Sequence, residues 1–484
     1  MVKVMSEVNG FKFREYSSLV DFNVLDSEEQ SLELQYRNKH VYGTGLGTSV
    51  NWNIDSDGNG EIYNDFFPEV EVPSMDFSIP QGLGIDKEAL SMRHLSDLDN
   101  TEKTQKLSEL RSVVDAYSGW IYSLIEKQKE LDVCYQSAAE VNITGCQKAR
   151  DRMLSGLRIL NDDPVVWTAF SLANRAMFMQ RVHLKLQSDT ADIDRYPGDE
   201  DLTKVLETMD YSEPNGITGD NYTWRLFQIA FLLMSIESIT NDSAYDRDVV
   251  DLIWFPTGGG KTEAYLGLTA FTIFYRRLAH LPDSDGTTVI MRYTLRLLAA
   301  QQFTRASTLI CACEYIRSDA VSHRPKYGKY SLGDTEITIG LWIGREHIPN
   351  TNADAKKHLK ELTDARKDTL QYAKEQHNKF QVLKCPWCGT KLVKDRIGTK
   401  MIGTFGYRMR NNRHFELFCP QESCFFNQQG KLPIQIIDEE LYACPPTLLF
   451  GTVDKFAMIP WKKEIGAFFG AGTDNRTPDL VIQD

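Results

Sequence analysis

The sequence predicts an α/β protein in which a parallel-sheet lobe, residues 221–484, follows a small β-rich module and a helical domain. Three observations support this prediction. Short apolar runs alternate with helical stretches after residue 221, as strands and crossover helices do around a parallel sheet. Residues 1–85 combine alternating apolar positions with many turn residues, whereas residues 86–220 carry apolar residues at helical spacing. Two pairs of cysteines mark residues 381–430 as an insertion in the lobe.

Charge is distributed unevenly along the 484 residues. Residues 1–250 carry a net −19 and residues 251–484 a net +6, which together give the −13 of the whole chain. A polyanionic ligand is therefore expected on the second part. No apolar run approaches the roughly 18 residues of a membrane span, and the N-terminus lacks the apolar segment of a secretory signal. We therefore expect a cytoplasmic protein with no membrane partner.

Turn residues and helix breakers divide the first two regions further. Residues 55–60 have the carboxylates of a calcium loop, but they lack its downstream glutamate, so we interpret them as a turn. In the helical domain, apolar residues recur at helical spacing through residues 107–131 and 146–160. The Asp163-Pro164 dipeptide then ends one helix, and the next is expected at residues 165–186.

A glycine-rich loop is the most informative feature of the chain. Residues 249–255 predict a buried strand, residues 256–260 must turn, and a helical pattern starts at Lys261. Glycines let backbone N–H groups converge on anionic oxygens, and a helix N-terminus adds the positive end of its dipole. Lys261 can then reach the β- and γ-phosphates, and the Thr262 hydroxyl can bind Mg²⁺. The alternative is a glycine-rich turn that happens to precede a helix. The predicted triphosphate site consists of Thr257, Gly258, Gly259, Gly260, Lys261 and Thr262.

The cysteines suggest a metal centre. Nine cysteines without a secretory signal favour thiols and metal over disulfides. One pair has the C-x₂-C spacing and the other C-x₄-C, with 30 residues between the pairs, and four thiolates suit tetrahedral Zn²⁺. Because the second gap is wider than usual, His414 or Cys444 could replace one ligand. A redox pair and unrelated buried cysteines are the other interpretations. The predicted zinc ligands are Cys385, Cys388, Cys419 and Cys424.

A basic stretch lies between the two cysteine pairs. Residues 391–413 contain seven lysines and arginines against one acidic residue, with Phe405 and Tyr407 among them. Basic side chains bind phosphates and aromatic rings stack on bases, so this pattern favours a nucleic-acid strand. We predict contacts from Arg408 and Arg410. The alternative is a solvated hairpin of a zinc ribbon.

The motifs and their order resemble those of a known enzyme class. Residues 256–262, Pro-Thr-Gly-Gly-Gly-Lys-Thr, resemble motif I of the superfamily 2 helicases. Residues 227–233, 254–267 and 449–456, with the cysteine pairs before the last of them, more closely resemble the DrmA helicases of the DISARM antiphage systems. The resemblance covers the second half of the chain and implies a RecA-like (P-loop NTPase) first helicase lobe with a zinc-ribbon-like insertion.

The resemblance also implies roles for residues outside the loop. Gln228 matches a glutamine that reads adenine in many such helicases, although an exposed glutamine on an amphipathic helix is an alternative. Asp484 ends an apolar strand as the Walker B motif would, and it would hold Mg²⁺ together with Thr262. Arginine at a helix start is often solvated, which leaves a second interpretation for Arg296. The implied nucleic-acid contacts are Thr294, Arg296, Thr452 and Lys455.

The activity implied by the resemblance is that of an ATP-dependent DNA helicase or translocase in bacterial phage defence, with ATP, Mg²⁺ and Zn²⁺ as cofactors. Its partners would be DNA and a DUF1998-type subunit, DrmB. Two alternatives remain: a duplex DNA translocase that does not unwind, and a non-enzymatic zinc-containing DNA-binding module. Because a second lobe and the glutamate expected after Asp484 are missing, we expect an N-terminal portion of a longer protein, nearly inactive alone.

Overall fold

The chain divides into two compact units in the computed structural model: residues 1–83 with 113–152, and residues 84–112 with 153–484. The structure describes residues 3–6, 12–15, 21–67, 75–97, 102–188, 194–212, 216–219, 222–254, 258–294, 298–321, 331–344, 346–363, 378–396 and 401–483.

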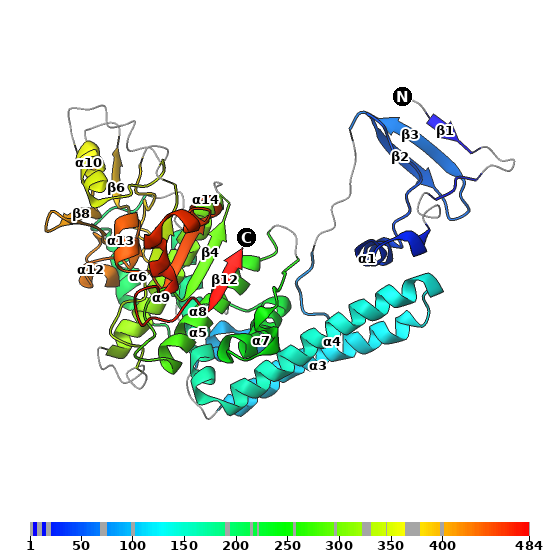
Figure 1. The fold of residues 1–484 in the computed structure, drawn as a ribbon, viewed down its shortest axis with the longest axis horizontal. Helices are drawn as coiled ribbons and strands as arrows, with labels where there is room; N and C mark the ends of the chain where they lie inside the picture. The colour runs from blue at the N-terminus through cyan, green and yellow to red at the C-terminus, as the bar shows by residue number, and fades with distance from the viewer. Residues whose placement is uncertain are drawn as a thin grey trace. The chain divides into compact units, whose positions relative to one another are not determined.

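The first unit contains a three-stranded antiparallel sheet in the order β1-β3-β2 (Figure 1). Its strands are β1 (Lys3–Met5), β2 (Ser49–Ile54) and β3 (Gly60–Asp65). Between β2 and β3, the Asp55 carboxylate accepts hydrogen bonds of 2.9 Å from the backbone N–H groups of Asp57 and Asn59. These bonds close a tight turn, so residues 55–60 form the predicted connection between strands.

A helix not anticipated by the sequence completes the first unit. Helix α1 (Ser27–Tyr36) starts at a capping box, in which Asp26 accepts from the backbone of Glu29 and the Glu29 side chain accepts from that of Asp26. Its buried Leu34 packs with Ala138 and Ala139. The latter two residues belong to α4 (Val133–Asp162), which follows α3 (Lys103–Gln128), and each of these two helices has residues in both units.

The second unit is built on a five-stranded sheet in the order β10-β5-β11-β4-β12, and every pair of neighbours is parallel (Figure 1). The prediction of a mixed α/β protein with a parallel sheet is therefore confirmed. The strands are β4 (Val289–Tyr293), β5 (Ile339–Trp342), β10 (Ile434–Gln435), β11 (Leu448–Thr452) and β12 (Leu480–Gln483).

Four helices form the main helical layer of this unit, and α5 packs against both α8 and α9. Helix α5 starts at the predicted break, because the Asp163 carboxylate accepts from the backbone of Val165 and Val166 while Pro164 takes the first position. The four helices are α5 (Pro164–Ser188), α7 (Leu226–Thr240), α8 (Lys261–Ala279) and α9 (Leu298–Val321).

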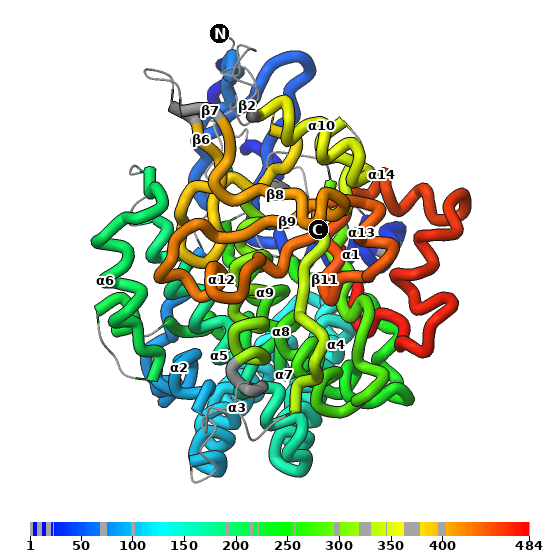
Figure 2. Tube along the Cα trace, turned by 90° about the vertical axis from the view of Figure 1, so that its left-hand side faces the viewer, coloured from blue at the N-terminus to red at the C-terminus, as the bar shows by residue number. Residues whose placement is uncertain are grey.

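The insertion contains two antiparallel hairpins, β6–β7 and β8–β9, and α10 packs against strands of both (Figure 2). Its strands are β6 (Val393–Arg396), β7 (Met401–Thr404), β8 (Tyr407–Arg410) and β9 (His414–Leu417), and α10 is Asn352–Thr363. The remaining short helices of the second unit are α2 (Met92–Leu95), α6 (Glu200–Thr208), α12 (Phe425–Gln428), α13 (Asp438–Ala443) and α14 (Val453–Phe456). Short 3₁₀ helices occur at Phe22–Val24, Lys87–Leu90, Gly216–Gly219, Tyr245–Asp248, Ile459–Trp461 and Lys463–Phe469.

The predicted strand before the glycine-rich loop is wrong for the part the structure describes. Residues 249–254 form no strand, and the side chains of Val250, Leu252 and Trp254 are exposed. Their alternation is that of a strand, but strands need a hydrogen-bonding neighbour, and none of the described strands pairs with this segment. Across the described ranges, no helix combines the length and apolarity needed to cross a bilayer.

Candidate nucleotide site and metal centre

The glycine-rich loop leads directly into the N-terminus of α8, which begins at Lys261. Gly258 and Gly260 have φ values of 84° and 82°, in the left-handed region that side chains rarely adopt. Gly260 is the N-cap residue, so the free N–H groups of the first helical turn and the helix dipole both lie at the loop. Lys261 and Thr262 occupy that first turn and are half-buried, whereas Thr257 lies outside the described residues.

Two side chains from the start of α7 bind the carbonyl side of this loop. Arg225 Nη1 donates to the carbonyl oxygen of Gly259, and Gln228 Nε2 donates to that of Gly260 at 2.7 Å. The Gln228 Oε1 atom accepts from the backbone N–H of Arg225 at 2.8 Å. Because Gln228 is only 4% exposed, the interpretation of an exposed glutamine is wrong. The structure brings Gln228 to the loop, as an adenine-reading role would require, but with its amide already bonded within the chain.

Sequence reasoning missed an ion-pair cluster behind the loop. The buried carboxylate of Glu263, directly after Thr262, pairs with Arg305 of α9 and, at 3.4 Å, with Arg181 of α5. Desolvation lowers the pKa of Arg305, and the nearby charge of Arg181 lowers it further. The cluster joins three helices at the first turn of α8. Its residues are far apart in the sequence, so only the carboxylate beside Thr262 could have signalled it.

Several predicted residues lie where parallel strands end. Thr294 follows β4 and is exposed, and β12 runs beside β4 with Gln483 opposite Arg292. The carboxyl end of β12 therefore lies at the same edge of the sheet as Thr294, because carboxyl ends of parallel strands meet at one edge. Arg296 and Asp484 themselves are outside the described residues.

The start of β12 is held by the last turn of α8. The Arg276 guanidinium is 1% exposed and donates to Asp479 Oδ2 at 3.0 Å and to the carbonyl oxygens of Thr477 and Arg476 at 2.9 and 2.8 Å. Burial lowers the pKa of Arg276, while the Asp479 carboxylate raises it. One helix thus carries the glycine-rich loop at its first turn and secures β12 at its last.

Thr452 ends β11 and Lys455 lies on α14 directly after it, but both side chains face the protein interior. Thr452 is buried, and its hydroxyl has no hydrogen-bond partner among the described residues. Lys455 pairs with the buried carboxylate of Asp438, and its ammonium lies 5.7 Å from the centre of the Trp342 ring. A contact of the Lys455 side chain with nucleic acid would therefore require this ion pair to open.

The four predicted zinc ligands form a buried cluster. Their sulfur atoms all lie within 4.8 Å of one another, and those of Cys388 and Cys419 are 3.4 Å apart. A tetrahedral Zn²⁺ site with bonds of about 2.3 Å has ligand sulfurs roughly 3.8 Å apart, so the geometry fits zinc. His414 instead bonds Glu440 at 2.7 Å, and neither it nor Cys444 is part of the cluster. The cluster consists of Cys385, Cys388, Cys419 and Cys424.

The first cysteine pair is embedded between two helices of the unit. His183 of α5 stacks on Trp387 with ring centres 3.5 Å apart, and its Nδ1–H donates to the Trp387 carbonyl oxygen at 2.6 Å. The Pro386 carbonyl oxygen accepts from Gln187 of α5 at 2.7 Å and from Thr308 of α9 at 2.9 Å. Complete burial lowers the pKa of His183 to about 3, which keeps the ring neutral.

The predicted basic stretch is partly neutralised by its own hairpin. Arg408 and Arg410 lie on β8, and both bind Glu416 of β9, at 3.0 and 3.1 Å. Arg408 also lies over the Phe418 ring at 4.8 Å. Lys391 is buried and pairs with Asp194 at 2.6 Å. Among the basic residues of this stretch whose side chains the structure describes, Arg408, Arg410 and Arg413 are exposed, and the first two share the Glu416 carboxylate.

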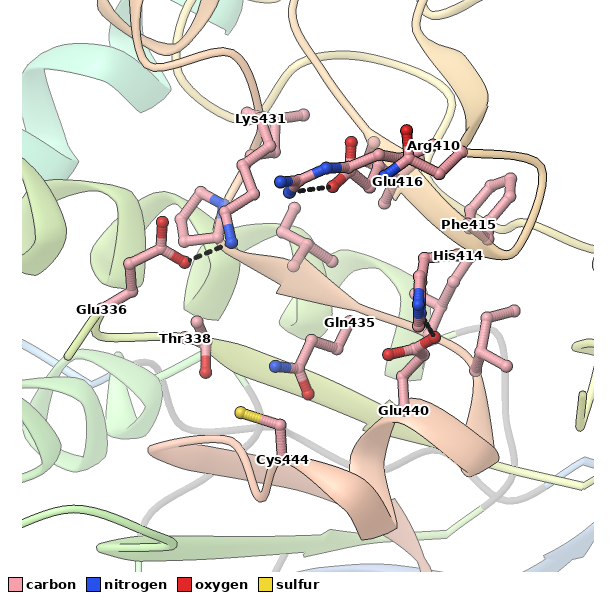
Figure 3. Close-up of a pocket in the computed structure, with 17 residues that line it drawn as sticks. Glu336, Thr338, Arg410, His414, Phe415, Glu416, Lys431, Gln435, Glu440 and Cys444 are labelled. Atoms are coloured by element: carbon pink, nitrogen blue, oxygen red, sulfur yellow. Dashed lines mark hydrogen bonds and ion pairs between the residues drawn. The ribbon is translucent and has the colours of Figure 1, made fainter. Parts of the chain in front are cut away.

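A cavity of about 460 Å³ lies between β9, β10 and α13 (Figure 3). Its walls carry three ion pairs, and Gln435 lies among them with a buried side-chain oxygen that has no partner among the described residues. Three carboxylates against two permanent cations make the cavity a poor site for phosphate. Its residues are scattered in the sequence, which explains why no motif indicated it. The pairs are Lys431–Glu336 at 2.7 Å, Arg410–Glu416 at 3.1 Å and His414–Glu440 at 2.7 Å.

Comparison with known proteins agrees with the helicase motifs. No family model matches the chain. The sequence is 34% identical over 450 residues to the DISARM protein DrmA of Bacillus paralicheniformis, in an alignment that covers 90% of this chain. The same alignment covers 36% of that protein, so the chain spans about a third of the relative's length. The chain is therefore DrmA-like along nearly all of its length, and the resemblance that the motifs predicted for its second half is confirmed.

Proposed function

We propose that this chain forms the first motor lobe of an ATP-dependent DNA helicase or translocase of the DISARM type. The observation that carries the proposal is the glycine-rich loop at the N-terminus of α8, a helix that contacts β4 and β12 of the parallel sheet. Nucleotides bind at the carboxyl edge of open α/β sheets, and helix N-termini bind phosphate. The similarity to a protein named for the DISARM system supports the cellular role.

In the proposed mechanism, the backbone N–H groups of residues 257–260 bind the phosphates and orient the triphosphate. Lys261 neutralises charge on the β- and γ-phosphates, which increases as the terminal phosphate leaves. Thr262 and Asp484 would hold Mg²⁺, which would supply further stabilisation of that charge. Closure against a second lobe completes the site, so residues 1–484 alone are expected to be nearly inactive.

DNA would bind across the carboxyl edge of the sheet and along the insertion. We propose that Thr294 and Arg296 contact the DNA backbone after β4, and that Thr452 and Lys455 do so after β11 once the Lys455–Asp438 ion pair has opened. Arg408 and Arg410, which remain accessible on β8, would extend this surface. The cysteine cluster would hold Zn²⁺ and fix the insertion, and a DUF1998-type subunit, DrmB, is the proposed protein partner.

The test uses the complete protein with the substitution Lys261→Ala and, as a matched control, Lys463→Ala at an exposed lysine of the same unit. Loss of one preorganised group that stabilises transition-state charge typically costs about a hundredfold or more in rate. We expect such a loss of DNA-stimulated ATPase activity for Lys261→Ala and an unchanged rate for Lys463→Ala.

Three outcomes separate the competing functions. Hydrolysis by Lys261→Ala at the parental rate would refute the assigned site. DNA binding without any nucleotide hydrolysis by the parental protein would favour the zinc-containing DNA-binding module. ATP hydrolysis stimulated by duplex DNA, without displacement of a labelled strand, would favour the translocase that does not unwind.

A further inference from the structure

The carbonyl side of the phosphate loop is fastened by one short segment, residues 225–228. Arg225 Nη1 donates to the Gly259 carbonyl oxygen, and Gln228 Nε2 donates to the Gly260 carbonyl oxygen at 2.7 Å. Consecutive N–H groups can converge on an anion only if the carbonyl groups between them point away. Two side-chain donors on that opposite side therefore stabilise the loop in the conformation that binds phosphate.

Gln228 is also fastened at its own oxygen. Its Oε1 atom accepts from the backbone N–H of Arg225 at 2.8 Å, at the start of α7. The amide keeps one further hydrogen and one lone pair, but the side chain is only 4% exposed. An adenine ring that used both amide atoms would have to displace this packing. Turning the amide towards the ring would break its bond to the Gly260 carbonyl group and leave that group without its donor.

The close fit at Gly260 disfavours any side chain at this position. A Cβ atom at this position would lie 3.0 Å from both Arg225 Nη1 and Gln228 Nε2. The positive φ at this position and the close approach of the two donor atoms thus both favour glycine. Arg225 in addition places a positive charge beside the loop, which favours any bound polyphosphate regardless of its base.

We propose that Arg225 and Gln228 are positioning residues that clamp the phosphate loop by its carbonyl groups, and that Gln228 does not select adenine. This inference rests on the proposed nucleotide site and concerns its specificity. The clamp acts through the loop that binds the triphosphate. Its loss therefore weakens the binding of ATP, GTP and tripolyphosphate, which carries no base, by the same factor.

The experiment measures the dissociation constants of ATP, GTP and tripolyphosphate with Mg²⁺ by calorimetry on the complete protein. The variants are Gln228→Met, which nearly preserves the side-chain volume, and Arg225→Met, which removes the other donor. Gln105→Met, at an exposed glutamine of α3, is the matched control. Loss of one hydrogen bond worth about 1 kcal/mol corresponds to about fivefold weaker binding. We expect about this loss for all three ligands in both clamp variants, with an unchanged ratio of ATP to GTP affinity.

Base reading predicts a different pattern. If Gln228→Met weakens the binding of ATP but not that of tripolyphosphate, or changes none of the three affinities, the clamp is refuted while the nucleotide site stands. If the parental protein binds none of the three ligands, the proposed function is refuted and the clamp with it. Thermal unfolding of each variant checks the fold, and Arg225→Met tests the same prediction should Gln228→Met not fold.

Discussion

Replacing Arg276 by methionine should destabilise the second unit far more than a single arginine usually does. The Arg276 guanidinium is 1% exposed and pairs with Asp479, which is 10% exposed. It also donates to carbonyl oxygens of residues 284–287 and 476–477. Removing one partner of a buried ion pair costs about 3–5 kcal/mol, because the other charge stays buried without compensation. We therefore expect Arg276→Met to lower the free energy of unfolding by about 4 kcal/mol.

Urea unfolding followed by tryptophan fluorescence measures this change, because six of the eight tryptophans belong to the second unit. The matched control is Arg247→Met, whose side chain is 28% exposed and pairs at 3.4 Å with Asp242, which is 61% exposed. Such surface pairs contribute about 1 kcal/mol or less. Equal effects of Arg276→Met and Arg247→Met would refute the reasoning, as would a loss below about 1 kcal/mol for Arg276→Met.

Three further predictions concern the metal centre and its surroundings. Cys388→Ser should remove the bound zinc found by metal analysis, whereas Cys444→Ser, at an exposed cysteine, should keep one equivalent; equal zinc content would contradict the assigned ligands. Arg305→Met should lower the free energy of unfolding by about 1–2 kcal/mol, because the buried Glu263 then keeps only its longer pair with Arg181. Arg305→Lys should recover part of this stability, and no loss in Arg305→Met would count against the ion pair. Since burial lowers the pKa of His183 to about 3, against about 6.5 when unfolded, its contribution to stability is complete above pH 6.5. That contribution is lost as the pH falls towards 3, by up to about 1.4 kcal/mol per pH unit. The free energy of unfolding, measured with zinc present, should fall between pH 7 and pH 5.5 as described, and the His183→Gln variant should show a smaller fall.

Features encoded within a few consecutive residues could be predicted from the sequence. The Asp163-Pro164 break begins α5, the glycine-rich loop leads into α8, and the two cysteine pairs converge. Each follows from local chemistry, such as a missing backbone N–H, a left-handed backbone conformation or a pair of thiols at a fixed spacing.

Features made by residues distant in the sequence could not be predicted. The alternation in residues 249–254 indicated a strand, but only the fold decides whether a neighbouring strand is present. Gln228 was placed near the nucleotide by its motif, yet the partners of its amide depend on how α7 lies against the loop. The Glu263–Arg305 ion pair joins two helices whose approach has no local signature.

The position of Trp387 has a consequence for dissecting this protein. The two residues between Cys385 and Cys388 pack against the helical layer. The Trp387 ring stacks on His183, and the Pro386 carbonyl oxygen accepts hydrogen bonds from Gln187 and Thr308. A finger-like module at the periphery could be deleted or swapped without harm. Here, excising residues 381–430 would expose side chains of α5 and α9 that the insertion covers, so the insertion could be exchanged between relatives only together with the matching surfaces of those helices.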